Sequence, residues 1–283
     1  MGTGRHLAGA VIGSALLAGA AGASPPDTSV VPFAPTPDDK AAVQALGEMP
    51  ADAFAAARFT APDGTALPYR ILAPREAGPA PLVVLLHGAG SMGTDNAAHL
   101  SPFLKAWAAP EVAERFPAHV VAPQVAVRMA EYEGGEDGLP AARPGASLPA
   151  VLALVDHLAR TLPVDRSRIY LVGFSMGASA ALVAAAAEPG RFAGVVSFAG
   201  VPPDRSRAAQ ATATPVLLVH GTEDGDNPYP AARAWAEALR AAGGRPRFVA
   251  YQGMGHEVPP DTALAADWRR WLFDQRAREA PRP

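Results

Sequence analysis

One short segment constrains the fold more than any other part of this 283-residue chain. The apolar run 169–172 leads into Gly173-Phe174-Ser175-Met176-Gly177, and an alanine-rich stretch, 178–187, follows at once. The apolar run predicts a buried strand, and the alanine-rich stretch predicts a helix. Glycine two positions either side of Ser175 permits a sharp turn without Cβ clashes. The serine hydroxyl is therefore expected to project from the end of the strand.

Short apolar strands and helices are expected to alternate along most of the chain. The expected strands are 58–60, 66–72, 81–86, 118–122, 168–172, 193–198, 215–219 and 247–251, and the expected helices are 148–162, 176–187, 230–241 and 262–275. Pro62-Asp63-Gly64 is a turn signal, so the first two strands should form an antiparallel hairpin. The pattern predicts an α/β fold with a mostly parallel central sheet, an antiparallel N-terminal edge and helices on both faces.

Composition narrows the function classes. The chain is 49% hydrophobic with a formal net charge of −3, which fits one globular domain with a sizeable core. No run of Lys or Arg stands out, so nucleic acid is not expected as a partner. The absence of cysteine excludes disulfides, zinc–thiolate sites and thiol nucleophiles. No metal or organic cofactor is expected.

The N-terminus has the pattern of an export signal. Arg5 and His6 precede the apolar stretch 7–20, and Ala21-Gly22-Ala23 is a small-residue cleavage pattern. We expect residues 1–23 to be a signal peptide cleaved after Ala23, which makes the protein secreted or periplasmic. The apolar run is short for a membrane span, so an uncleaved anchor is the alternative and stable insertion after cleavage is not expected.

Two segments outside the alternating pattern remain. Residues 24–37 are rich in proline and are expected to form an extended tether, with Thr36 capping a short helix that begins at Pro37. Residues 38–283 are expected to form a single catalytic domain. The stretch between Gln124 and Ser147 is rich in Gly, Pro and acidic residues, so we expect a long irregular loop. It either overhangs the site and selects substrate or is a solvated surface insertion.

A nucleophilic serine needs an imidazole to take its proton, and the imidazole needs a carboxylate to orient it. In a fold of this kind the chain order is serine, acid, histidine, each after its own strand. The strand at 215–219 is followed by Asp224, for which Glu223 and Asp226 are the alternatives. The strand at 247–251 is followed by a glycine-rich loop that carries His256, the last histidine of the chain. His220 is expected to support the acid's loop by hydrogen bonding.

The turn after the strand at 81–86 has the composition of an oxyanion hole. It reads His87-Gly88-Ala89-Gly90, and two backbone N–H groups could stabilise the negative charge of a tetrahedral intermediate. One donor should be Met176, directly after the serine, and the other Ala89, with Gly90 as the alternative. His87 is expected to brace the turn rather than to touch substrate. A phosphate cradle is disfavoured, because Gly-Lys-Ser/Thr is absent.

With these residues in place, the chain resembles the α/β-hydrolase superfamily over nearly all of its length after residue 23. More narrowly, it resembles the secreted esterases and predicted peptidases grouped with phospholipase/carboxylesterase and polyhydroxyalkanoate-depolymerase-like proteins. The stretches that carry the resemblance are 86–90, 93–96, 120–124, 164–177, and His220-Gly221-x-x-Asp224 with Pro228. The last of these favours Asp224 over Asp226. The segment after Gln124 has no match, and the cysteine pair of several extracellular depolymerases is absent, so the resemblance implies a reaction class and leaves the substrate open.

The expected function is an exported serine hydrolase that cleaves small-molecule or polymeric carboxylic esters through an acyl-enzyme. Ser175, Asp224 and His256 would be catalytic, and Ala89 and Met176 would form the oxyanion hole. The first alternative is a peptidase with the same machinery, although no separate propeller or large lid is apparent to grip a peptide. The second is a non-catalytic binding protein, which would normally have lost one of the three catalytic residues. The oligomeric state is left open.

Overall fold

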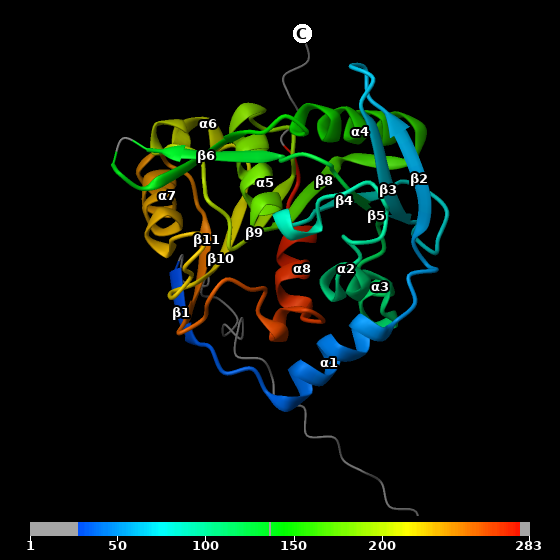
Figure 1. Ribbon diagram of the computed structural model, residues 1–283, viewed down its shortest axis with the longest axis horizontal. Helices are drawn as coiled ribbons and strands as arrows, with labels where there is room; N and C mark the ends of the chain where they lie inside the picture. The colour runs from blue at the N-terminus through cyan, green and yellow to red at the C-terminus, as the bar shows by residue number, and fades with distance from the viewer. Residues whose placement is uncertain (1–27, 136, 278–283) are drawn as a thin grey trace, which may run out of the picture.

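A computed structural model describes residues 28–135 and 137–277, so the expected signal peptide, 1–23, lies outside the described residues. Within them, nine strands form one sheet in the order β1-β11-β10-β9-β8-β4-β5-β3-β2 (Figure 1). The strands are β1 (Thr28–Pro32), β2 (Ala55–Thr60), β3 (Ala66–Leu72), β4 (Ala80–Leu86), β5 (His119–Pro123), β8 (Val164–Phe174), β9 (Gly194–Phe198), β10 (Val216–Gly221) and β11 (Arg247–Gln252). From β1 to β5 neighbouring strands are parallel, whereas β3 is antiparallel to β5 and to β2. The predicted α/β fold is confirmed.

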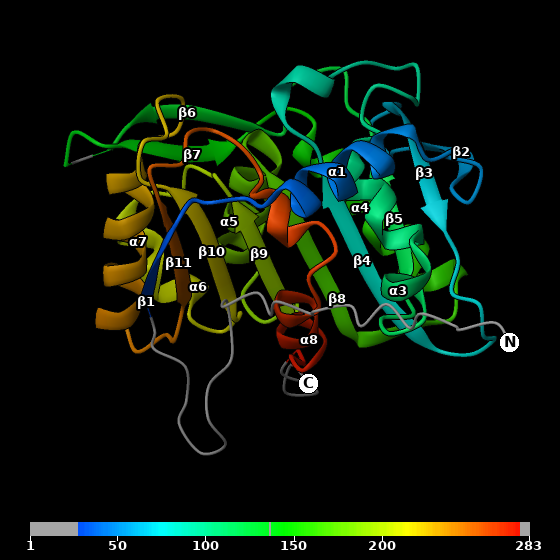
Figure 2. The same ribbon diagram turned by 90° about the horizontal axis from the view of Figure 1, so that it is seen from below.

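Helices cover both faces of this sheet (Figures 1 and 2). They are α1 (Pro37–Glu48), α2 (Pro102–Lys105), α3 (Pro110–Ala113), α4 (Leu148–Thr161), α5 (Met176–Ala187), α6 (Ala208–Ala211), α7 (Tyr229–Ala241) and α8 (Ala266–Phe273). The central strands are buried on both sides. Leu82, Val84 and Leu86 of β4 share a core with α4 to α7, whereas Val83 and Leu85 point into a second core with α2, α3 and α8. In residues 28–135 and 137–277, none of the helices has the length and apolarity to cross a bilayer.

The N-terminal segment corrects one prediction. Residues 24–37 were expected to form a tether, but Thr28–Pro32 is strand β1, which pairs in parallel with β11 from Thr28 beside Phe248 to Pro32 beside Gln252. Val30 and Val31 favour a strand. Pro32 has no backbone N–H to donate. It is tolerated here because β1 lies at the edge of the sheet, where no neighbouring strand needs that donor. The helix start at Pro37 is confirmed.

The segment between Gln124 and Ser147 is also more regular than expected. It contains the antiparallel hairpin of β6 (Ala130–Gly134) and β7 (Pro140–Pro144), which crosses over α5 in Figure 1. The Tyr132 hydroxyl lies 3.1 Å from Ser179 Oγ in α5, and the Ala142 N–H donates to the Pro202 carbonyl at 2.7 Å. The expectation of an irregular loop is therefore wrong for this part, which packs against the helix that follows Ser175.

Candidate active site

The predicted sharp turn at Ser175 is confirmed, and its geometry explains both flanking glycines. Ser175 has φ 54° and ψ −120°, which a side-chain-bearing residue rarely adopts, and it separates β8 from α5. A methyl group on Gly177 would overlap the carbonyl oxygen of Leu86, and one on Gly173 would overlap the backbone of Gly177. The glycines therefore permit close backbone packing, while the serine itself carries the strained conformation.

The three side chains predicted as a triad form one continuous chain of hydrogen bonds. Ser175 Oγ lies 2.9 Å from His256 Nε2, and His256 Nδ1 lies 2.9 Å from Asp224 Oδ2 and 3.0 Å from Oδ1. They follow β8, β11 and β10, whose carboxyl ends meet at one edge because the strands are parallel. The ionised carboxylate can only accept, so Nδ1 carries the proton and Nε2 is free to accept the serine proton.

The structure also separates Asp224 from its two alternatives. Asp224 is 7% exposed, whereas Glu223 and Asp226 are exposed to solvent. The Asp224 carboxylate accepts the backbone N–H groups of Asp226 at 3.0 Å and Asn227 at 2.8 Å, and it lies 3.2 Å from His220 Nε2. Burial by itself would raise the pKa of Asp224, but the hydrogen bonds from His220, His256 and Asn227 hold it well below its usual range. The expected support from His220 is confirmed.

The pKa of His256 is shifted in the opposite direction from that of Asp224. Its hydrogen bond to Asp224 raises the pKa of His256 above the usual value, although burial opposes the rise. The ring packs against Phe174, with ring centroids 5.0 Å apart. This combination favours an imidazole that accepts a proton readily and keeps a fixed orientation, which are the requirements for a general base.

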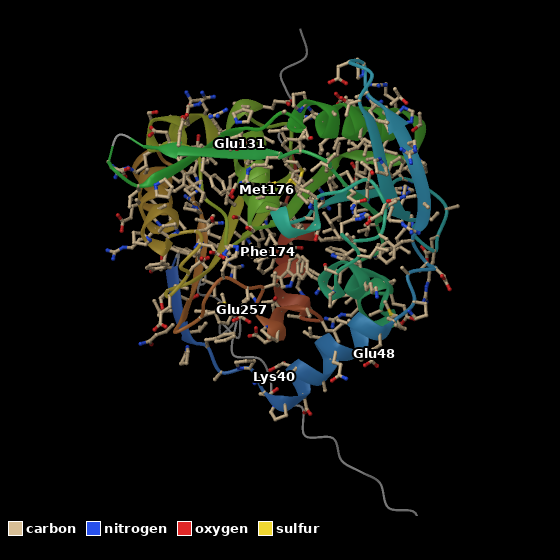
Figure 3. The ribbon with its side chains drawn as sticks, viewed as in Figure 1. Lys40, Glu48, Glu131, Phe174, Met176 and Glu257 are labelled. Atoms are coloured by element: carbon tan, nitrogen blue, oxygen red, sulfur yellow. The ribbon has the colours of Figure 1, made fainter. Side chains whose placement is uncertain are left out.

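The predicted oxyanion donors lie on two turns that meet beside Ser175. Met176 is the first residue of α5, and Ala89 opens a short 3₁₀ turn, Ala89–Ser91, after β4. N–H groups at the start of a helical turn have no acceptor within that turn. A Cβ on Gly88 would lie 3.5 Å from Ser175 Cβ, so the turn approaches the serine closely. Figure 3 shows Phe174 and Met176 near the centre of the molecule. The oxyanion role of Ala89 and Met176 remains a prediction.

His87 braces this turn as expected. Its Nε2 accepts the Val125 N–H at 3.2 Å, so the proton resides on Nδ1, which donates to the Gly88 carbonyl at 2.7 Å. Burial lowers the pKa of His87, against the opposing effect of that hydrogen bond. The neutral ring therefore joins the turn to the chain after β5.

Sequence reasoning missed the buried amides that hold the surrounding loops. Gln124 is fully buried, and its side chain accepts the Asn96 N–H at 2.6 Å and donates to Asp95 Oδ1 at 2.9 Å. Asn227 donates from Nδ2 to the Ala199 carbonyl at 2.6 Å, behind the acid's loop. In the sequence, Gln124 belongs to a stretch that carries the family resemblance but has no assigned role. The sequence signal that could have revealed this role is a polar residue placed directly after an apolar strand, where burial would require hydrogen-bond partners.

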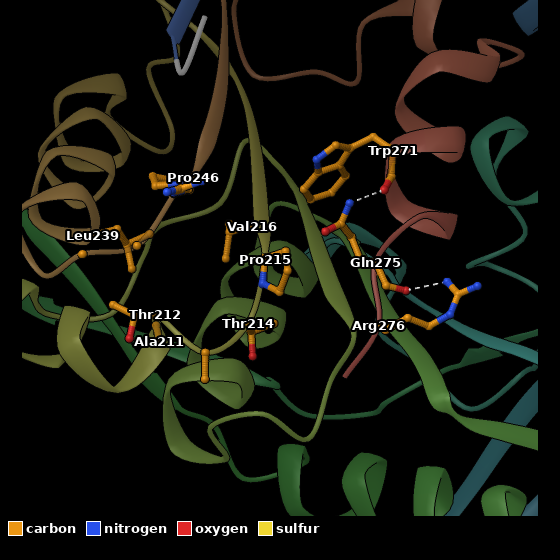
Figure 4. A pocket seen from close by; sticks show the side chains of 14 residues that line it. Ala211, Thr212, Thr214, Pro215, Val216, Leu239, Pro246, Trp271, Gln275 and Arg276 are labelled. Atoms are coloured by element: carbon orange, nitrogen blue, oxygen red, sulfur yellow. Dashed lines mark hydrogen bonds between the residues drawn. The ribbon is translucent and has the colours of Figure 1, made fainter. Parts of the chain in front are cut away.

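Two cavities lie at opposite ends of the sheet. One of about 340 Å³ adjoins Gly88 and Phe174, next to the hydrogen-bonded triad. A larger one, of about 590 Å³, lies at the amino ends of β10 and β11 and is lined by Pro215, Pro246 and Trp271 (Figure 4). Ligands of open α/β sheets bind at the carboxyl ends of the strands, so the smaller cavity belongs to the candidate site. Among the described residues, no group of three or more His, Asp or Glu side chains could hold a metal ion.

Comparison with known proteins agrees with the fold and with ester hydrolysis as the reaction class. Residues 141–266, less than half of the chain, match the family model described as Phospholipase/Carboxylesterase. The crystal structure of a thermostable esterase is similar with a TM-score of 0.71 at 28% identity, covering 80% of this chain and 63% of its own. The chain belongs to the α/β-hydrolase superfamily.

Several similar proteins carry the names of esterases. The Nocardia uniformis subsp. tsuyamanensis protein NocK, which carries the name of an esterase, is 29% identical across 96% of this chain and 76% of its own length. Esterase YpfH of Escherichia coli (strain K12) is 33% identical across 41% of this chain and 50% of its own. The acylaminoacyl peptidase of Pyrococcus horikoshii, with a TM-score of 0.58 and 15% identity over 81% of this chain and 43% of its own, shares the fold alone. This chain thus spans less than two thirds of either solved chain, and the relatives named here with higher identity carry the names of esterases.

Replacing each carboxylate in turn should distinguish the role of Asp224 from that of Asp226. Asp224→Asn leaves the packing intact but favours the wrong imidazole tautomer, so kcat for p-nitrophenyl butyrate should fall by about 10³- to 10⁴-fold. Asp226→Asn, the matched control, should retain most of the activity. Similar losses in both variants would contradict the assignment of Asp224.

The raised pKa of His256 sets the acid side of the pH profile. A general base must be neutral, so kcat/KM should fall as the pH drops through the His256 pKa, with a midpoint above about 6.5. In Asp224→Asn the main cause of the rise is gone, and the midpoint of the residual activity should move to lower pH. A wild-type midpoint at or below the ordinary histidine value would contradict the geometry.

Proposed function

We propose that this protein is an exported serine hydrolase that cleaves carboxylic esters through Ser175, His256 and Asp224. The observation that carries the proposal is the continuous hydrogen-bond chain from Ser175 Oγ through His256 to Asp224, at the carboxyl edge of the sheet. The esterase relatives and the similar esterase structure support ester hydrolysis as the reaction class. Small-molecule or polymeric esters are the proposed partners.

Each step follows from the positions of these groups. His256 Nε2 takes the hydroxyl proton as Ser175 Oγ attacks the ester carbonyl carbon. The N–H groups of Met176 and Ala89 stabilise the oxyanion, a contribution of about 3–4 kcal/mol for one donor in a related arrangement. His256 then returns its proton to the departing alkoxide, and an acyl-enzyme remains. A water molecule then attacks the acyl carbon as His256 takes its proton. His256 returns that proton to Ser175 Oγ as the acyl–oxygen bond breaks, which releases the acid and restores the Ser175 hydroxyl.

Peptide hydrolysis is the alternative with the same machinery. Peptidases among the similar structures share only the fold with this chain, whereas the relatives with higher identity carry esterase names. A non-catalytic role fits less well, because Ser175, His256 and Asp224 are all present and hydrogen-bonded. Ester hydrolysis is therefore the function that the site supports best.

The test compares the protein from Ser24 onward with its Ser175→Ala variant on p-nitrophenyl acetate and butyrate. Loss of the nucleophile should reduce kcat by about 10⁴-fold or more and abolish labelling by a fluorophosphonate probe. Ser206→Ala, at an exposed serine away from the site, is the matched control and should behave as wild type. A p-nitroanilide with the same acyl group should react far more slowly. Equal rates for Ser175→Ala and wild type would refute the assignment, and faster anilide cleavage would favour the peptidase.

We also propose that residues 1–23 direct export. Full-length protein expressed in a host with a periplasm should appear there, or in the medium, with Ser24 as its N-terminal residue. Ala23→Asp should block cleavage and leave a larger, cell-associated form. N-terminal sequencing of fractionated cells distinguishes the outcomes, with a cytoplasmic marker enzyme as the leakage control. An intact N-terminus on protein found only in the cytoplasm would contradict export.

A further inference from the structure

The cavity beside Ser175 is walled by segments from widely separated parts of the chain. Gly88 on the turn after β4 forms one wall, and Phe103 of α2 forms another. Val258, two residues after His256, and Val43 of α1 close the remaining sides. The cavity adjoins the candidate site at Gly88, which lies against Ser175, and at Phe174, whose ring packs on His256.

The position of the base indicates which part of an ester enters this cavity. His256 Nε2 must reach the leaving oxygen to protonate it, so the alcohol lies on the His256 side of the carbonyl carbon. The cavity is lined by Gly88 and Gly90, on either side of the predicted oxyanion donor Ala89, and by Phe174 and Val258 near His256. The acyl group remains bonded to Ser175 Oγ after the alcohol leaves, and the turn at Gly88 lies against Ser175, so the acyl group is the substituent that this cavity can hold throughout the reaction.

The walls of the cavity favour an uncharged acyl group. Among the described residues that line it there is no Asp, Glu, Lys or Arg, and its ionisable members are His87 and His99. Burial lowers the pKa of both, and His87 nearby adds to the effect on His99, whose pKa falls to about 4. Both rings are thus neutral near pH 7. Burying a carboxylate or ammonium there would leave it without an opposite charge, which is strongly unfavourable.

Helix α1 limits the size of the cavity. Its volume of about 340 Å³ is near the lower end of the range of about 300–1,000 Å³ for small-molecule sites. Leu46 of α1 packs in a buried cluster with Ala106 and Ala263, and Lys105 Nζ donates to the Gly47 carbonyl at 2.7 Å. These contacts hold the half-buried Val43 in the wall. A firmly packed wall should stop a long chain rather than yield to it.

We propose that the cavity between α1, α2, the turn after β4 and the loop after His256 is an acyl-binding pocket for uncharged apolar acyl groups of medium size, with Val43 and Val258 setting the limit. This inference rests on the proposed ester hydrolysis at Ser175 and adds its substrate class. The N-terminal helix thereby becomes a specificity element of the site.

The experiment measures kcat/KM for p-nitrophenyl esters from acetate to decanoate. In wild type the value should rise from acetate to a medium-length acyl group and then fall. Val43→Trp and Val258→Trp narrow the pocket at two independent positions, so each should lower the octanoate-to-acetate ratio of kcat/KM by about 10-fold or more. Val30→Trp, at a 60%-exposed valine of β1 outside the pocket, is the matched control and should leave the ratio unchanged.

Two further substrate series separate the alternatives. Acetate esters of alcohols of increasing length should show the same rates relative to one another in the narrowed variants and in wild type, and the p-nitrophenyl hemiester of succinic acid should react at least about 10-fold more slowly than the butyrate. An octanoate-to-acetate ratio that stays unchanged in both tryptophan variants would overturn the acyl-pocket assignment, and so would a response confined to the alcohol series. In either case, hydrolysis of the acetate ester would leave the proposed function standing. Failure of wild type on every ester would instead refute the proposed function and this inference with it.

Discussion

The close approach of three backbone segments at Ser175 is the constraint on which the rest of the site depends. Gly177 packs against the Leu86 carbonyl so tightly that no side chain fits between α5 and the end of β4. The positive φ of Ser175 costs on the order of 1–3 kcal/mol. It is held from both sides, because the Ser175 N–H donates to Phe198 and the Ser175 carbonyl accepts from Ser179. Hydrogen bonds to β9 and α5 therefore hold Ser175 in its strained conformation, and the hairpin supports Ser179 through the Tyr132 hydroxyl.

Two electrostatic environments meet at this point. Asp224 is buried, but it is surrounded by donors that stabilise its charge, so the polarity of the site is concentrated along one line from the carboxylate to the serine. In the adjoining cavity, the half-buried His87 and the buried His99 are neutral rings, and His99 donates from Nε2 to the Ala122 carbonyl. At the same edge of the sheet, the line from Asp224 to Ser175 thus supports charge separation, and the cavity beside it supports apolar binding.

Much of this arrangement could be predicted from local patterns because the chemistry sits at strand ends. The turn at Ser175, the order of Asp224 and His256 after their strands, and the sheet type all follow from short sequence windows. Spacing alone could not choose between Asp224 and Asp226, since that choice depends on which carboxylate the fold buries against His256. The β6–β7 hairpin and β1 were missed for a related reason: their stability comes from packing and pairing with distant residues, and their own composition resembles a loop.

The pairing of β1 with β11 has a consequence for the order in which the chain can fold. Thr28 lies beside Phe248, so the first strand of the sheet acquires its partner only when almost the whole polypeptide is available. Contacts of such large sequence separation close slowly, because the intervening chain must be ordered first. Until then the edge of β11 is open to pairing with other chains.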